Sequence, residues 1–311
     1  MDDQMATTGV RGALNTQIGK LQTWWKRRQI ERHFRPYVTR ERALLLEERQ
    51  KHESLYEDPE ESPLVSVMIP THNRGKLLVE RTLPSVFGQT YRNYEIVIAG
   101  DCCTDDTEER VRRLNDPRIR FTNLPKRGRQ PRQVKARWLI SGSYAMNHAF
   151  RHVWGKWLAP LDDDDVFTPD HIESLLRLAQ RGHHELAYGR LRLEERPGQW
   201  KTLGRPPLET RDCNNSASLY RTYLRAFEFS VDNWRIGWGE DVHRTWRLAQ
   251  AGVRWGFLDQ TVAFAPLRPA VTIYGHLAED RDWYGQRCNC RKCRRARRGG
   301  THQNVSVAAR E

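Results

Sequence analysis

Short apolar segments alternate with helical segments over residues 64–161, and this alternation constrains the fold more than any other feature of the sequence. Apolar runs at 65–69, 95–99 and 156–161 have the length of buried strands, and amphipathic segments separate them. Strands that alternate with helices form a largely parallel sheet covered by helices on its faces. We therefore expect an α/β fold that binds its ligand at the carboxyl ends of the strands.

The flanks of this region differ from it in composition. The amino-terminal part is polar and has helical periodicity, with one helix expected over 39–55 and an acidic, proline-containing linker after it. After about residue 275 the chain becomes basic and irregular. We expect three parts, namely an amino-terminal helical extension with linker over 1–62, the α/β domain over 63–270, and a basic, cysteine-containing tail over 271–311.

The charge of the chain points to an anionic partner. There are 52 Lys and Arg residues against 39 Asp and Glu residues, a formal net charge of +13. Nucleic acid, an acidic membrane face and a phosphorylated substrate all fit this surplus. The longest apolar run, 64–69, is far shorter than the ~20 residues of a membrane-spanning helix. We expect no transmembrane segment, no secretory signal and a cytoplasmic location, where six cysteines are more typical of thiols or metal ligands than of disulfides.

The most specific pattern is the run of four aspartates from Asp162 to Asp165. It follows the apolar run 156–161 directly and precedes a helix that begins near Pro169. Adjacent carboxylates repel one another unless a cation or hydrogen-bond donors balance them, and hard oxygen ligands select Mg²⁺ or Mn²⁺. Such an ion could hold a diphosphate and neutralise the charge that builds on a leaving nucleoside diphosphate. The alternative is a solvated acidic loop that caps the following helix.

Polar side chains also follow the first two apolar runs. They are Thr71, His72 and Arg74 after the first run and Asp101 after the second. Hydroxyl, guanidinium and carboxylate groups at a sheet edge could bind a nucleotide. The alternatives are an ordinary polar turn for the first group and a helix cap for the second.

A further acidic site opens the helix expected over 241–250. Glu240 and Asp241 follow Trp238, whose two glycine neighbours would let backbone approach a ligand closely. A carboxylate at this position could act as a general base, and the alternative is a helix cap. Trp238 and Trp234 could stack on an acceptor sugar, although large aromatic side chains are more often buried in the core.

Three basic segments account for much of the positive charge. The loop 126–137 could close over a diphosphate as a lid, or it could be a solvated loop. An amino-terminal helix with an apolar stripe over 14–25 could lie on an anionic membrane, although packing within the protein is the more common role of such a stripe. In the tail, Cys288, Cys290 and Cys293 could bind zinc or lie in an exposed basic segment.

Five stretches occur in an order that resembles the family 2 glycosyltransferases with the GT-A fold, particularly the spore-coat polysaccharide type. The stretches are 65–74, 85–107, 115–121, 147–176 and 238–258. The resemblance implies a metal-dependent, inverting transfer of one sugar per encounter from a nucleotide-diphospho-sugar, with a UDP-sugar as the expected donor. The acceptor would be a hydroxyl of a glycan or glycoconjugate, which could be lipid-linked, and the protein could contact an anionic membrane peripherally.

The same resemblance assigns roles to single residues. It places Thr71, His72, Arg74, Asp101, Asp162 and Asp163 at the donor, Asp162 and Asp164 at Mn²⁺ or Mg²⁺, and Asn214, Asn215 and Trp238 at the acceptor. Asp241 would be the catalytic base, with Glu240 as the alternative. Two other functions are alternatives. One is sugar transfer to a modified base in DNA or RNA, because the charge of +13 exceeds what a small neutral acceptor needs. The other is a non-catalytic basic binding module on a degenerate scaffold, which fits the departures from the family pattern at Gly100 and Met146.

Overall fold

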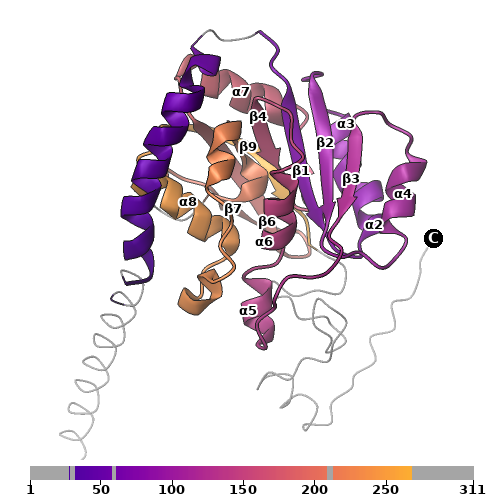
Figure 1. The fold of residues 1–311 in the computed structure, drawn as a ribbon. Coiled ribbons are helices and arrows are strands. Elements are labelled where there is room, and N and C mark those ends of the chain that lie inside the picture. Colours follow the sequence, from indigo (N-terminus) through magenta and orange to yellow (C-terminus); the bar gives the residue numbers. More distant parts are fainter. Residues whose placement is uncertain (1–27, 29–31, 58–60, 209–212, 268–311) are drawn as a thin grey trace, which may run out of the picture.

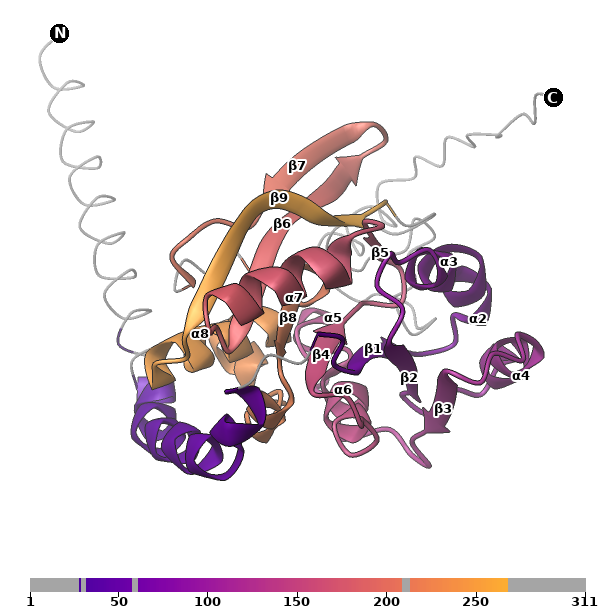
Figure 2. The same cartoon turned by 90° about the horizontal axis from the view of Figure 1, so that it is seen from above.

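A single sheet of nine strands forms the centre of the protein, and helices cover both of its faces (Figures 1 and 2). The computed structural model describes residues 28, 32–57, 61–208 and 213–267. Along the sheet the strands are β3 (Ile119–Asn123), β2 (Tyr94–Gly100), β1 (Val65–Thr71), β4 (Trp157–Pro160), β8 (Ser218–Arg221), β6 (Leu186–Arg196), β9 (Trp255–Ala265) and β5 (Val166–Phe167), and β7 (Gln199–Leu203) pairs with β6.

The two halves of the sheet differ in strand direction. From β3 to β4 all neighbours are parallel, as the alternation of strands and helices predicts. Beyond β4 the pairings are antiparallel except between β6 and β9. The expectation of a largely parallel sheet is therefore correct for the first half and wrong for the second, where β4 meets the short antiparallel strand β8 instead of a parallel one.

The alternation of side chains along β1 divides the core into two layers. Val67 and Ile69 belong to one buried apolar cluster, and Met68 between them belongs to the other. The first cluster includes side chains from η2 (Leu78–Thr82) and α3 (Leu83–Phe87), which continue the short helix α2 (Gly75–Leu77), and from α4 (Thr107–Arg113) and α7 (His171–Arg181). The second includes side chains from α6 (Ser143–Ala149) and α8 (Glu240–Ala251). Both faces of the sheet are thereby buried.

Apart from a long amino-terminal helix, the remaining described helices are short. They are η1 (Glu53–Tyr56), α5 (Val134–Trp138), η4 (Asn215–Ala217), η5 (Thr222–Ala226) and η6 (Asn233–Ile236). Strand β6 and strand β7 form a hairpin that extends away from the rest of the sheet (Figure 2). The short helices η4 and η6 lie in the connections that lead to β8 and α8, so they help to shape the edge of the sheet where the aspartates are found.

An amino-terminal helix over residues 32–52 packs against α8 (Figure 1). It begins earlier than the predicted 39–55, because Phe34 is buried and contacts Trp246 of α8, with ring centroids 4.0 Å apart. Glu41 and Arg247 form an ion pair in which both side chains are buried. The helix is therefore part of the same folded core as the sheet, and the segment 14–25 lies outside the described residues.

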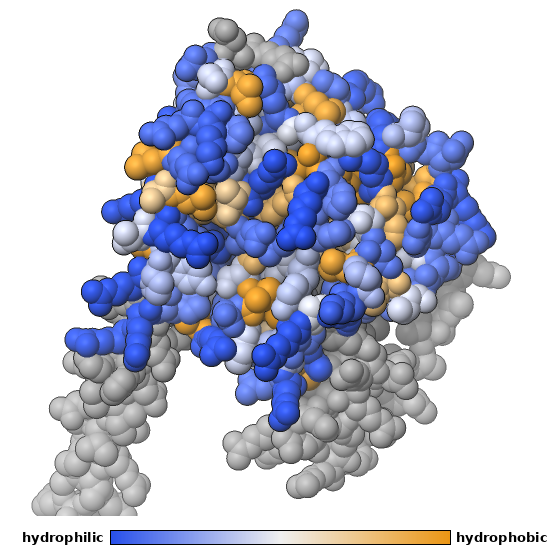
Figure 3. All heavy atoms as spheres, in the orientation of Figure 1, coloured by the Kyte–Doolittle hydropathy of each residue, from blue (hydrophilic) through white to orange (hydrophobic). Residues whose placement is uncertain are grey.

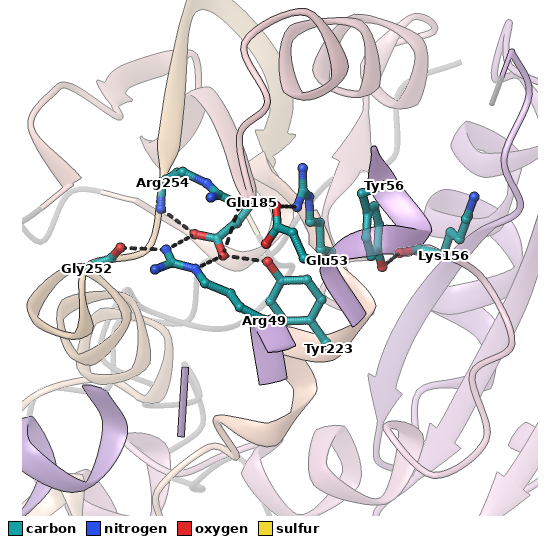
Figure 4. A network of polar contacts seen from close by, with 9 residues as sticks. Arg49, Glu53, Tyr56, Lys156, Glu185, Tyr223, Gly252 and Arg254 are labelled. Atoms are coloured by element: carbon teal, nitrogen blue, oxygen red, sulfur yellow. Dashed lines mark hydrogen bonds and ion pairs between the residues drawn. The ribbon is translucent and has the colours of Figure 1, made fainter. Parts of the chain in front are cut away.

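A network of polar contacts fixes the end of this helix to the sheet (Figure 4). Arg49 donates two hydrogen bonds to the carboxylate of Glu185, with distances of 2.7 and 2.6 Å. The Tyr223 hydroxyl and the Arg254 backbone N–H donate to the same carboxylate. The Glu185 carboxylate is fully buried, and its donors join it to three other parts of the chain.

The surface in Figure 3 is mainly hydrophilic, with apolar residues in small separate patches. Exposed large apolar side chains in the described part include Leu46, Leu55, Trp154 and Trp200. Within that part of the chain, no helix is both long enough and apolar enough to cross a membrane.

Candidate active site

A pocket opens at the carboxyl ends of β1, β2 and β4, where the parallel strands were expected to bind a ligand. Most of the polar residues selected from the sequence line it, together with Arg127: they are Thr71, His72, Arg74, Asp101, Asp162, Asp163, Asp164 and Glu240. Residues from five separate stretches of the chain therefore meet at one place. The carboxylates outnumber the basic groups, so the pocket has an acidic floor.

The central aspartates are held by residues that follow β1. Asp163 accepts a hydrogen bond from the Thr71 hydroxyl at 2.8 Å and another from Arg74 at 2.7 Å. The same nitrogen of Arg74 lies 3.4 Å from Asp164, which is almost fully buried. One guanidinium group thus faces two carboxylates. This arrangement argues against the solvated acidic loop that the sequence left as the alternative, because Asp163 and Asp164 are both buried.

Asp101 lies at the other side of the pocket. Its Oδ2 accepts hydrogen bonds from Arg127 at 3.0 and 3.3 Å, and its backbone carbonyl lies 2.8 Å from Nδ1 of His72. Its Oδ1 is buried and accepts no hydrogen bond from the described residues. The next residue, Cys102, has a φ of 58°, a conformation that costs energy for residues with a side chain and is frequent near functional sites. Oδ1 of Asp101 is therefore a buried oxygen atom that can accept a hydrogen bond from a ligand.

The two carboxylates at the start of α8 are placed differently. Glu240 lines the pocket, whereas Asp241 accepts a hydrogen bond from the side-chain amide of Asn214 at 3.2 Å and from the N–H of Val242 at 2.7 Å. Burial raises the pKa of both groups, and in Glu240 the charge of Asp241 raises it further. Asn214 is thus linked to one of the two candidate bases, and its role at the acceptor stays a prediction.

Asp165 is a buried group that sequence reasoning did not single out. Burial raises its pKa well above the usual range, and the charges of Asp162, Asp163 and Asp241 add to this effect. A hydrogen bond from Ser216 acts in the opposite direction. The Ser216 hydroxyl also accepts a hydrogen bond from the backbone N–H of Asp162. The only signal in the sequence was its place in the run of four aspartates.

Three comparisons with known proteins bear on this pocket. A sequence profile described as Glycosyl transferase family 2 matches residues 66–236, which is more than half of the chain and contains every pocket residue named above except Glu240. The chain belongs to glycosyl transferase family 2. The resemblance found in the sequence is thereby confirmed at the level of the family.

Curated relatives of this family 2 chain match it over shorter segments. WcaA of Escherichia coli K12, named for colanic acid biosynthesis, is 32% identical over 123 residues, which are 39% of this chain and 39% of WcaA. WfgD of Escherichia coli, a UDP-Glc:alpha-D-GlcNAc-diphosphoundecaprenol beta-1,3-glucosyltransferase, is 27% identical over 127 residues, which are 40% of this chain and 45% of WfgD. The chain thus spans less than half the length of these relatives.

Solved structures of transferases share the fold of this family 2 chain. TarS of S. aureus, in complex with UDP-GlcNAc, has a TM-score of 0.50 at 18% identity, covering 66% of this chain and 58% of that one. A mannosyltransferase of Pyrobaculum calidifontis, in complex with GDP-Man and Mn²⁺, has a TM-score of 0.50 at 20% identity, covering 73% and 66%. The predicted α/β fold of the GT-A type is thereby confirmed.

Two residues assigned to the acceptor lie away from open space in this family 2 protein. The ring of Trp238 is buried, with its centroid 4.9 Å from that of Phe34 and 6.1 Å from that of Trp246. This is the core packing that the sequence allowed as the alternative, so we do not carry Trp238 into the acceptor site. Asn215 is buried as well, and its carbonyl accepts a hydrogen bond from Ser218.

Other predicted features of the chain are split or lie elsewhere. The side chains of the basic loop 126–137 are divided between two sites. Arg127 lines the pocket, whereas Arg129 and Arg132 line a second groove. Within the described residues, no three His, Cys, Asp or Glu side chains are grouped so that they alone could hold a metal ion. Cys288, Cys290 and Cys293 lie outside the described part of the chain.

Proposed function

We propose that this chain transfers a single sugar, with inversion, from a nucleotide-diphospho-sugar to an acceptor hydroxyl. The observation that carries the proposal is the pocket at the carboxyl ends of the parallel strands, where Asp162, Asp163, Asp164 and Glu240 lie across from Asp101. Family membership supports the reaction class. The UDP-GlcNAc and GDP-Man complexes of proteins with the same fold support the class of donor, and we take a UDP-sugar as the first candidate.

The nucleotide would bind between Asp101 and the residues that follow β1. The buried Oδ1 of Asp101 would accept the N3–H of uracil, since no described residue donates to that atom. His72 and Thr71 would line the same side of the pocket. Arg74 would meet the diphosphate while it keeps its hydrogen bond to Asp163, because a guanidinium group has five donors.

The carboxylate oxygens of the pocket are suitable ligands for a divalent cation that binds together with the diphosphate. Mg²⁺ in such sites is held by one or two carboxylates, with phosphate oxygens and water as its other ligands, and Mn²⁺ prefers the same oxygen ligands. Asp162 and Asp164 both line the pocket and would be these two carboxylates. A bound cation would neutralise the charge that develops on the leaving diphosphate.

The base would come from the start of α8. It takes the proton of the acceptor hydroxyl while the acceptor oxygen bonds to C1 of the donor sugar and the bond from C1 to the diphosphate oxygen breaks, which inverts C1. The raised pKa of Asp241 makes it a stronger base when it is ionised. Its hydrogen bond from Asn214 would orient it toward the acceptor. Glu240 remains the alternative base, and its place in the pocket lining supports it.

Calorimetry of nucleotide binding tests the donor site. We expect UDP to bind, to bind more tightly with Mn²⁺ than without it, and to bind more tightly than GDP or dTDP. Asp164→Ala should remove the effect of Mn²⁺ and keep metal-independent binding. Absence of binding by all three nucleotides, with and without Mn²⁺, would refute the proposal.

Rates of donor hydrolysis or transfer test the base. Loss of a general base typically costs ~10²–10⁴-fold in rate, so either Asp241→Asn or Glu240→Gln should show a loss of this size and the other a smaller one. Asp259→Asn, which removes an exposed carboxylate of β9, is the matched control. The rate should fall as the pH drops through the raised pKa of the base, since only the ionised form accepts a proton. Wild-type rates from both variants would overturn this assignment.

A further inference from the structure

A second groove lies beside the pocket and has no role in the proposed donor site. It has a volume of about 680 Å³, which is within the range of ligand-binding clefts, ~300–1,000 Å³. It is formed by the basic loop, α6 and the segment that contains η6. The groove is large enough for several sugar units. Its polar and aromatic lining residues are Arg129, Gln130, Arg132, Gln133, Tyr144, Asp232, Trp234 and Arg235.

The lining carries a surplus of positive charge. Three guanidinium groups, those of Arg129, Arg132 and Arg235, face the groove with the single carboxylate of Asp232. Asp232 lies 3.1 Å from Arg235 and so balances that arginine. Arg129 and Arg132, which are both exposed, are left as the surplus. Like charges that line one groove repel one another, and an anionic ligand would relieve that repulsion.

The groove also has an aromatic wall. Trp234 is half-buried, and the guanidinium of Arg235 lies 5.3 Å from its ring centroid, which restricts how the ring can turn. The Tyr144 hydroxyl donates to the carbonyl of Arg129 at 3.0 Å and thereby holds the loop. Oε1 of Gln130 is buried and accepts no hydrogen bond from the described residues. An aromatic ring, an amide oxygen and two guanidinium groups together fit a sugar that carries an anionic substituent.

The position of the groove connects it to the proposed base. The chain passes from η6 directly to the start of α8, where Glu240 lines the donor pocket. Asn233, which is fully buried, fixes this connection by donating to the carbonyls of Leu139 and Trp238, at 2.5 and 2.8 Å. On the other side, Tyr144 of the groove is adjacent in α6 to Ala145 of the pocket. A ligand in the groove would therefore enter the donor pocket from the side of α8.

We propose that this groove binds the acceptor, and that the acceptor is a saccharide with a phosphate or carboxylate group next to the sugar that packs on Trp234. Arg129 and Arg132 bind the anionic group, and Trp234 binds the sugar ring. The inference rests on the proposed function, since it supplies the second substrate of the same reaction. It narrows the open choice of acceptor to an anionic saccharide, which could be a sugar phosphate or an acidic glycan.

Calorimetric titration in the presence of saturating UDP tests the groove, because UDP keeps the ligands out of the donor pocket. The ligands are glucose 1-phosphate for the phosphate source, an unsulfated chondroitin tetrasaccharide for the carboxylate source, and neutral cellotetraose. We expect at least one anionic ligand to bind about tenfold or more tightly than cellotetraose. The anionic ligand that binds shows whether the groove recognises a phosphate or a carboxylate group.

Matched variants separate the groove from the net charge of the protein. The double variant Arg129→Ala with Arg132→Ala should bind the anionic ligand about tenfold or more weakly. Arg112→Ala with Arg113→Ala removes the same charge from the exposed face of α4 and should leave binding unchanged. Trp234→Leu should weaken the binding of the saccharide and leave the binding of inorganic phosphate as in the wild type. All five substitutions are at partly or fully exposed side chains, so the fold should be retained.

Several results would overturn the inference. Equal affinity for anionic and neutral saccharides would do so, and so would an equal loss in both pairs of arginine variants. Tighter binding of a single-stranded oligonucleotide, lost in the Arg129 and Arg132 variants, would assign the groove to nucleic acid instead. Binding of UDP is measured first and separately: UDP binding without anionic saccharide binding refutes the groove alone, and saccharide binding without nucleotide binding refutes the proposed function alone.

Discussion

Buried carboxylates lie in two regions of this protein, and the fold shifts their pKa values in opposite directions. Glu185 is fully buried, and although burial by itself would raise its pKa, hydrogen bonds from Arg49, Tyr223 and the N–H of Arg254 hold the pKa below its usual value. At and beside the pocket, burial and neighbouring carboxylates raise the pKa of Glu240 and Asp165 well above the usual range.

The difference teaches which carboxylates serve the fold and which are available for chemistry. A carboxylate that receives several hydrogen bonds from its own protein stabilises the folded state and has little left to offer a ligand. In the pocket, Arg74 is shared by Asp163 and Asp164 and the carboxylates outnumber the basic groups, so a cation or a proton must balance them. Each of the following predictions alters one side of this comparison.

The largest effect on stability should come from Glu185→Ala. The substitution leaves Arg49 without its carboxylate in a largely buried site, and breaking a buried ion pair from one side typically costs ~3–5 kcal/mol. Urea unfolding monitored by circular dichroism measures the free energy of unfolding. Glu185→Gln, which keeps an acceptor oxygen, should cost less. A cost near zero for Glu185→Ala would show that the network in Figure 4 is not what attaches the amino-terminal helix.

Asp165→Asn should have a smaller effect of the opposite sign. It removes one of the mutually repelling carboxylates and keeps an oxygen that can accept from Ser216, so the variant should be about 1 kcal/mol more stable at pH 7. Urea unfolding without divalent cations measures this. A destabilised variant would show that the aspartates are already balanced within the protein.

The pH dependence sharpens the same contrast. Because the folded protein holds a proton on Asp165 more tightly than the unfolded chain does, wild-type stability should rise as the pH falls from 7 toward 5, and Asp165→Asn should show less of this rise. The lowered pKa of Glu185 has the opposite effect on stability. The stabilisation that Glu185 contributes is fully present above its unfolded pKa of about 4.5, and it is lost as the pH falls through the lower pKa of the folded protein. Unfolding curves at pH 7, 5 and 3.5 separate the two.

The smallest effect should come from Glu109→Ala on α4. Glu109 pairs with Arg113 four residues later, and both side chains are mostly exposed. Water and salt screen such a pair, so we expect no measurable change in the unfolding midpoint. A cost comparable to that of Glu185→Ala would mean that ion pairing rather than burial explains the comparison.

The sequence predicted the parallel half of the sheet well because β1 and β2 are buried on both faces and are mainly apolar. Strand β8 was missed because its four residues, two of them polar, give no recognisable pattern. The start of the amino-terminal helix was placed too late because Phe34 is buried by contacts with α8, more than 200 residues away along the chain. Such contacts leave no local signal.

The candidate site shows the same division. Its polar residues could be found because they follow apolar strands directly, and parallel strands bring such residues to one edge. The interactions that support them could not be found, because Arg74 and Asp163 are 89 residues apart and Arg127 lies 26 residues from Asp101. The burial of Trp238 also depended on a distant segment, since Phe34 covers it.

The position of β9 inside the sheet has a practical consequence for anyone who wishes to shorten the protein. The family profile ends at residue 236, before α8 and β9, and begins after the helix over 32–52. A fragment cut at those limits would lose the partner of both β6 and β5 and would expose open strand edges to other molecules. The limits of sequence similarity are therefore not the limits of a piece that can fold, and expression of residues 66–236 alone should give aggregated material.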